Sequence, residues 1–317
     1  MTNTKQEELK KLLVSADFKE ESYESVPMQE LIILKNSAMS MKEKNVKVQQ
    51  AALFFTKREE FFYHLVLRRL QKIEVIYTLF TKATNLPYVY CDPDTCNDQV
   101  WIFSEESFAK KSALKEMQNK RELLVVKLEN KQFLSFYMSL YAMGVNELLL
   151  DGCVNKLAVE LETLVRKPDY SKLPPEKQPV SNPELQLTAI YFAQERNMPE
   201  EARDNGNLRD LEEEMLVNLH RGKLLMPVQV PEESGEKVQV QDMKLPLLKL
   251  PNGNAYHPIC TDPNEFQKFN LKKEFRAITI DCAKLNQMIG KNEEVKGIIL
   301  NPASVRLAIP KEKLGQA

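Results

Sequence analysis

The feature that most constrains the fold of this chain is an internal repeat. The stretch GVNELLLDG (144–152) matches EVKGIILNP (294–302). The match aligns Asp151 with Asn301, and it aligns the apolar residues that precede Asp151 with those that precede Asn301. Self-similarity of this kind is typical of one structural unit that occurs twice. Because both stretches are short, apolar and followed by turn residues, each predicts a buried strand.

A second pair of stretches extends the repeat upstream. LPYVYCDPDTCNDQVWIFSEESF (86–108) aligns with LPLLKLPNGNAYHPICTDPNEF (245–266), starting from a shared Leu-Pro. Alternating β-branched and aromatic residues predict strands on both sides of a turn. Asn252-Gly253 is a strong hairpin signal, and Asp-Pro-Asp takes its place in the first copy.

Helices are expected before and between these strands. A capping box at Thr56 predicts a helix over 57–71, and Ser104 is placed to cap a helix that ends near residue 118. In the second copy the equivalent first helix is expected up to Arg221. Residues 154–166 also suggest a helix. Each copy is therefore predicted as helix, three strands, helix, strand, helix, strand.

The two copies are separated by a proline-rich segment. Five prolines lie within KPDYSKLPPEKQPVSNP, which excludes a regular helix or a central strand. The predicted fold class is α+β, with two tandem small mixed-sheet domains, helices packed on each sheet, and a helical N-terminal arm. The predicted boundaries are 1–44 for the arm, 45–166 for the first domain, 167–182 for the linker and 183–317 for the second domain.

Composition narrows the choice of partners. Of the 317 residues, 43% are hydrophobic, and 44 basic residues balance 45 acidic ones. A near-zero net charge makes nucleic acid an unlikely partner. The first 18 residues lack the apolar run of a secretory signal, and no stretch is long enough for a transmembrane helix, so no membrane association is expected. Five cysteines fit a reducing compartment, and we expect a cytoplasmic location.

Cys91 and Cys96 flank two aspartates in YCDPDTC, which raises the question of a metal or redox site. A zinc site needs about four ligands, usually from two such pairs. The aligned stretch of the second copy supplies a turn and no matching ligands. We therefore interpret the segment as a turn and predict no metal site and no cofactor.

Catalytic motifs are scarce. With nine glycines, the chain contains no phosphate-binding loop and no nucleophile elbow. His64 and His220 lie in helices, where solvated or structural roles are expected. His257 lies on a strand near a turn, a common position for binding residues, and Cys260 follows it closely. We predict no catalytic residues, and these two would be the first to test in an enzyme.

Aromatic residues gather on the predicted hairpin strands. Tyr88, Tyr90 and Trp101 lie on the first hairpin, and Tyr256 on the second. Since successive side chains of a strand point to opposite faces, one face belongs to the core and the other could be a binding surface. Together with His257, these four are the predicted binding residues.

The repeated stretches, and above all LVNLHRGKLLMPVQV and VKGIILNPASVRLAIP of the second copy, resemble the SseB family of bacterial proteins linked to enhanced serine sensitivity. The resemblance covers about 45–166 and 183–312, and the second copy is closer to the family pattern. It implies an α+β fold and a bacterial origin. It implies no enzymatic activity, substrate or cofactor.

We therefore expect a cytoplasmic, non-catalytic interaction or regulatory protein. It would bind another protein or a peptide through the hairpin faces or through the groove between the copies. The alternative is an enzyme of unknown class with its site near His257 and Cys260. Nucleic-acid binding is a third and weaker hypothesis. The partner and the oligomeric state do not follow from the sequence.

Overall fold

A computed structural model describes residues 3–230 and 244–315 of the chain. The α-helices in these residues are α1 (Asn3–Val14), α2 (Met28–Lys44), α3 (Gln49–Lys72), α4 (Glu106–Gln118), α5 (Asn130–Ala142), α6 (Pro183–Arg196), α7 (Asn205–Arg221), α8 (Pro263–Phe269), α9 (Cys282–Gly290) and α10 (Lys311–Leu314). The strands are β1 (Val75–Thr81), β2 (Val89–Cys91), β3 (Asp98–Phe103), β4 (Leu123–Glu129), β5 (Glu147–Leu150), β6 (Leu157–Glu160), β7 (Lys223–Val228), β8 (Leu248–Lys249), β9 (Ala255–Ile259), β10 (Arg276–Asp281), β11 (Val295–Leu300) and β12 (Leu307–Pro310). The predicted α+β class is confirmed.

The first sheet has the strand order β4-β1-β3-β5-β6, and β2 pairs with β3 beside this path. Strands β3 and β5 are parallel, and the other pairs are antiparallel. The parallel strands β3 and β5 are connected through α4, β4 and α5, which brings the chain back to the same end of the sheet. We call the elements from α3 to β6 the first unit.

The second sheet is built from two parts. Strands β10 and β7 form a pair, and β12-β11-β9-β8 form a four-stranded sheet. Reciprocal backbone hydrogen bonds between Leu225 and Cys260, 2.9 and 2.8 Å long, join β7 to β9. Strands β9 and β11 are parallel, and the other pairs are antiparallel. We call the elements from α7 to α10 the second unit.

Strand order and pairing sense are the same in the two units, with β1 to β6 taking the places of β7 to β12. The register fixes equivalent residues. Ile102 faces Leu150 in the first unit, and Ile259 faces Leu300 in the second. The alignment of Asp151 with Asn301 follows from this register. The predicted alignment of Leu86 with Leu245 was wrong by one residue. The Leu86 carbonyl accepts from the Thr81 N–H in the first unit, and the Lys244 carbonyl accepts from the equivalent Gln229 N–H in the second.

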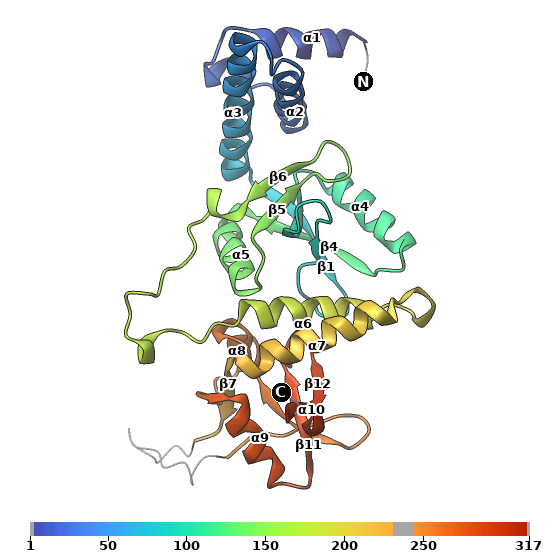
Figure 1. Ribbon diagram of the computed structural model, residues 1–317, viewed down its shortest axis with the longest axis vertical. Helices are drawn as coiled ribbons and strands as arrows, with labels where there is room; N and C mark the ends of the chain where they lie inside the picture. The colour runs from blue at the N-terminus through green and yellow to red at the C-terminus, as the bar shows by residue number, and fades with distance from the viewer. Residues whose placement is uncertain (1–2, 231–243, 316–317) are drawn as a thin grey trace.

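The molecule is elongated, and its layers follow the chain (Figure 1). The helices α1 and α2 form the arm at one end, where they pack beside α3, and the first sheet comes next. The hairpin of α6 and α7 lies across the middle, between the two sheets. One continuous cluster of buried apolar side chains runs from Leu9 in the arm to Leu314 in α10. A smaller cluster, with Leu79 and Phe103, lies under α4 on the other face of the first sheet.

The arm is attached to α3 by a buried arginine. Arg58 is fully buried, and its guanidinium donates to the carbonyls of Leu12, Leu13 and Asp17 and to the Tyr23 hydroxyl. These carbonyls lie at and after the end of α1, where a cation complements the helix dipole. The single side chain therefore stabilises the end of α1 against the middle of α3.

Three local predictions were wrong. Residues 154–166 contain β6 and a short 3-10 helix, so each unit has an additional last strand, β6 or β12, that the sequence reading missed. Helix α3 begins at Gln49, and Thr56 lies inside it with its hydroxyl donating to the Ala52 carbonyl. Ser104 does not cap α4, because its side chain donates to Asp151. No helix in the described parts of the chain is long and apolar enough to cross a membrane.

Candidate functional site

The predicted aromatic residues of the first hairpin meet on the α4 face of the first sheet. Tyr88 and Tyr90 come from β2 and the residue before it, and Trp101 comes from the middle of β3. All three belong to, or pack against, the small apolar cluster beneath α4. Because α4 covers only part of this face, Tyr90 and Trp101 remain half-exposed at its open side.

The three rings form a continuous aromatic wall. The centroid of Trp101 lies 5.5 Å from that of Tyr88, with the ring planes at 87°. Its distance to Tyr90 is also 5.5 Å, with the planes at 57°. Edge-to-face contacts at such distances are favourable and keep each ring in a defined orientation. Burial raises the pKa of Tyr88, so its hydroxyl stays protonated at neutral pH.

The aromatic wall is one side of an open cavity of about 720 Å³, which we call the aromatic groove. Its other walls come from α4, from the turn after β2, from the β5–β6 connection, and from the segment after α6. The last of these contributes Met198 and Ala202, about 100 residues from Trp101 in the sequence. Such a volume is typical of ligand-binding clefts.

Helix α6 closes one end of the groove because it is fixed to β2. The Gln194 amide makes two hydrogen bonds with the backbone of Val89, which donates to Oε1 (3.0 Å) and accepts from Nε2 (2.9 Å). On the same helix, the Tyr191 hydroxyl donates to Asp98 Oδ1 at 2.6 Å. Gln194 thus occupies the Val89 N–H and C=O on the open edge of β2, as a neighbouring strand would.

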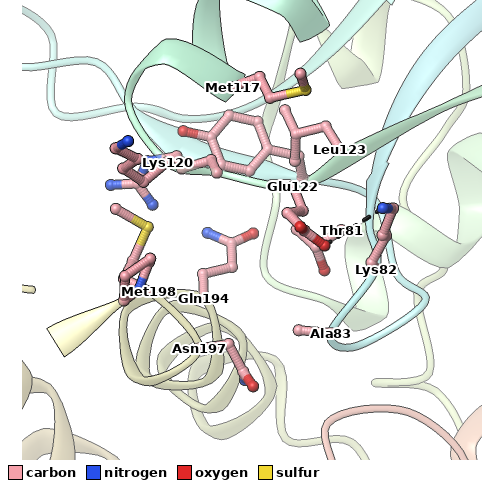
Figure 2. A pocket seen from close by; sticks show the side chains of 13 residues that line it. Thr81, Lys82, Ala83, Met117, Lys120, Glu122, Leu123, Gln194, Asn197 and Met198 are labelled. Carbon is pink, nitrogen blue, oxygen red and sulfur yellow. Dashed lines mark ion pairs between the residues drawn. The ribbon is translucent and has the colours of Figure 1, made fainter. Parts of the chain in front are cut away.

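A second cavity of about 450 Å³ adjoins the groove, and we call it the methionine pocket (Figure 2). Met117, Leu123 and Met198 point into it from α4, β4 and the end of α6. Lys82 and Glu122 form an ion pair of 3.3 Å at its rim. Methionine side chains adapt to different partners, which suits a pocket for a variable apolar side chain.

Charged side chains lie at the boundary between the two cavities. The Arg121 guanidinium lies over the Tyr88 ring, 5.9 Å from its centroid. It is also within 3.8 Å of Glu116 and within 3.7 Å of Glu195. Arg121 therefore links α4, the aromatic wall and α6. Lys156, from the β5–β6 connection, also lines the groove.

The other predicted binding residues lie in the second unit, away from the groove. Tyr256 and His257 are buried in β9, and His257 Nδ1 donates to the Pro246 carbonyl at 3.1 Å. Burial lowers the pKa of His257 and raises the pKa of the fully buried Cys260 thiol. Both groups are therefore neutral at pH 7 and are placed as core residues. The structure brings together three of the five predicted residues.

The segment from Cys91 to Cys96 forms the hairpin turn between β2 and β3. Asp92 N–H donates to the Asn97 carbonyl, and Cys96 N–H donates back to the Asp92 carbonyl. Both cysteines are exposed. Partial desolvation of the Cys91 thiol raises its pKa above the usual value. Within the described residues, no group of three or more His, Cys, Asp or Glu side chains is arranged to hold a metal ion.

Sequence reasoning missed the residues that complete the groove from a distance. Gln194, Met198 and Ala202 follow the linker, and Lys156 lies in a segment that was predicted as a helix. The heptapeptide LTAIYFA before Gln194 signals a buried helix, but nothing in it indicates which strand edge the amide will reach. A polar residue on an otherwise apolar helix was the only available signal.

Comparison with known proteins supports the family resemblance for the C-terminal third of the chain. The family described as SseB protein N-terminal domain matches residues 201–316, which contain the second unit. The predicted resemblance is confirmed there, and the stronger agreement of the second copy is consistent with it. No curated protein sequence matches the chain.

Two solved structures show a distant likeness. Tic22 from Plasmodium falciparum has 8% identity and a TM-score of 0.20, over 78% of this chain and 93% of that one. Anabaena Tic22, described as a protein of protein transport, has 10% identity and a TM-score of 0.18, over 73% and 92%. Scores this low carry no conclusion about fold or function.

Proposed function

We propose that this protein is a non-catalytic interaction protein that binds a peptide segment of a partner in the aromatic groove. The observation that carries the proposal is the aromatic wall of Tyr88, Tyr90 and Trp101 in an open cavity, with residues of the α6–α7 connection on the other side. Tyrosine and tryptophan in a partly enclosed, rigid setting are the residues that most often dominate binding energy at protein interfaces.

The proposal unites the two surfaces that were predicted separately. The groove contains a hairpin face, and it also lies where the first unit meets the helices before the second sheet. We infer that the two units are copies of one ancestral unit, and that their contact through α6 created the groove. All five cysteines are free thiols, which fits a cytoplasmic location as part of this proposal.

Selection from a random peptide library displayed on phage tests the proposal without knowledge of the partner. We expect selection on the purified protein to yield related peptides that no longer bind Tyr90→Ala. Leu134→Ala is the matched control, because Leu134 is 65% exposed on α5 and outside the groove. Recovery of no peptide that distinguishes Tyr90→Ala from Leu134→Ala would contradict the proposal.

A further inference from the structure

Two polar atoms in the floor of the aromatic groove are buried and have no hydrogen-bond partner among the residues that the structure describes. They are Trp101 Nε1, a donor, and Gln99 Oε1, an acceptor. The Gln99 side chain is only 1% exposed, and its Nε2 already donates to Asp92 and Glu147, which fixes the orientation of the amide. A buried polar group without a partner costs about 1–3 kcal/mol, so such atoms are uncommon in native proteins and are candidates for contact with a bound group.

Trp101 offers an aromatic surface and an N–H donor at the same position. Its ring is held by Tyr88 and Tyr90, and both neighbours lie on the same face of the sheet. Proline-rich segments commonly bind in grooves lined by aromatic side chains, where the proline rings pack against the aromatic rings. A polyproline II segment makes no internal hydrogen bonds, so its carbonyls are free to accept from an indole N–H.

The surroundings of the groove disfavour the other common peptide conformations. A strand would have to pair with the edge of β2, but Gln194 already occupies the Val89 N–H and C=O there. A helix uses most of its backbone carbonyls internally and would offer Trp101 Nε1 few backbone acceptors. An extended segment with free carbonyls is the conformation that completes the site.

We propose that the aromatic groove binds a proline-rich partner segment in the polyproline II conformation, with one of its carbonyls accepting from Trp101 Nε1. This inference rests on the proposed function and specifies its ligand class. A non-proline residue of the segment supplies the N–H for Gln99 Oε1. Both polar atoms are covered by other protein atoms in the structure. Binding therefore involves a local shift of the side chains around Trp101.

The test compares a fluorescein-labelled proline-rich peptide with the same peptide carrying alanine at each proline, by fluorescence anisotropy. We expect the proline peptide to bind at least about tenfold more tightly. Trp101→Phe keeps an aromatic ring and removes the N–H, and it should weaken binding by about tenfold. Tyr170→Phe, at a 45% exposed linker tyrosine outside the groove, should leave binding unchanged. Trp101 is the sole tryptophan of the chain, so its emission reports the shift in the unmodified protein.

The outcomes separate this inference from the proposed function. Equal affinity for the proline and alanine peptides, or an unchanged affinity of Trp101→Phe, would overturn the inference. Phage peptides that depend on Tyr90 but lack proline would also overturn it, while the proposed function would stand.

Discussion

The two units share a topology, but they differ in what they place at equivalent positions. In the first unit, Trp101 faces Leu149, and in the second, Pro258 faces Ile299. Likewise, Tyr90 pairs with Gln99, while Leu248 pairs with Tyr256. The second unit thus has Pro258 at the position of Trp101 and Leu248 at the position of Tyr90. Under the proposed function, the common fold provides stability and the side chains of the first unit provide the binding surface.

A second difference lies in a buried polar cluster that both units contain. Asp151 and Asn301 follow the equivalent strands β5 and β11, are fully buried, and have positive φ angles of 53° and 46°. Each accepts from a backbone N–H just after the neighbouring strand, that of Ser104 at 2.8 Å or that of Thr261 at 2.9 Å. The cluster fixes a tight turn in both units, with a carboxylate in one and an amide in the other.

The partner helices complete these clusters in matching ways. Gln29, in the first turn of α2, donates to Asp151 at 2.5 Å. Gln186, in the first turn of α6, accepts from Asn301 Nδ2. The direction of the hydrogen bond is reversed because the amide at 301 has a donor that the carboxylate at 151 lacks. Exchanging the two side chains therefore tests the comparison directly.

The largest effect is expected from Asn301→Asp. The change places a carboxylate opposite Gln186 Oε1 and beside Asp262, which already accepts from Thr261 at 2.7 Å. An uncompensated buried charge costs about 3–5 kcal/mol. Urea unfolding followed by circular dichroism should show a loss of this size at pH 7. A loss smaller than that of a surface substitution would mean that the cluster is more open than its burial indicates.

A smaller effect is expected from Gln194→Ala. The change leaves the buried Val89 N–H and C=O without partners and should reduce the free energy of unfolding by about 2 kcal/mol. It should also weaken the binding of peptides in the groove, because Met198, which lines the groove, directly follows α6. Asn197→Ala is the control, since the Asn197 side chain donates only to Ala193 within α6 and its loss should cost little.

The smallest effect is expected from Asp151→Asn, and it should depend on pH. Burial raises the pKa of Asp151 above its usual value of 3.8. The folded state therefore favours the protonated acid, and this contribution to stability is lost as the pH rises through the raised pKa. The variant has no such group, so its stability relative to the natural protein should increase from pH 4 toward pH 7. A constant difference across this range would show that Asp151 titrates as in the unfolded chain.

The sequence predicted those parts of the fold that rest on local signals. The apolar strands, the turn at Asn252-Gly253 and the left-handed Gly144 at the end of α5 all lie where their residues indicate. The helix predicted at 154–166 was wrong, because Leu157 and Val159 alternate with exposed residues in a strand of only four residues. Such short strands are stabilised by their neighbours, and their own length gives little signal.

The site could be predicted only in part, for a related physical reason. Tyr88, Tyr90 and Trp101 lie close together in sequence, and strand alternation is enough to place them on one face. The residues that complete the groove depend on how α6 packs against β2, which is a tertiary contact. Tyr256 and His257 appeared equivalent to the first set, but Tyr256 takes the place of Gln99 and is buried.

The most direct test of the central claim exchanges the side chains at the paired positions 90 and 248 and measures peptide affinity. The best phage-selected peptide would be titrated against Tyr90→Leu and Leu248→Tyr by fluorescence anisotropy. We predict that Tyr90→Leu weakens binding by about tenfold, or about 1.4 kcal/mol, and that Leu248→Tyr leaves it unchanged. Equal effects of the two substitutions would contradict the assignment of binding to the first unit.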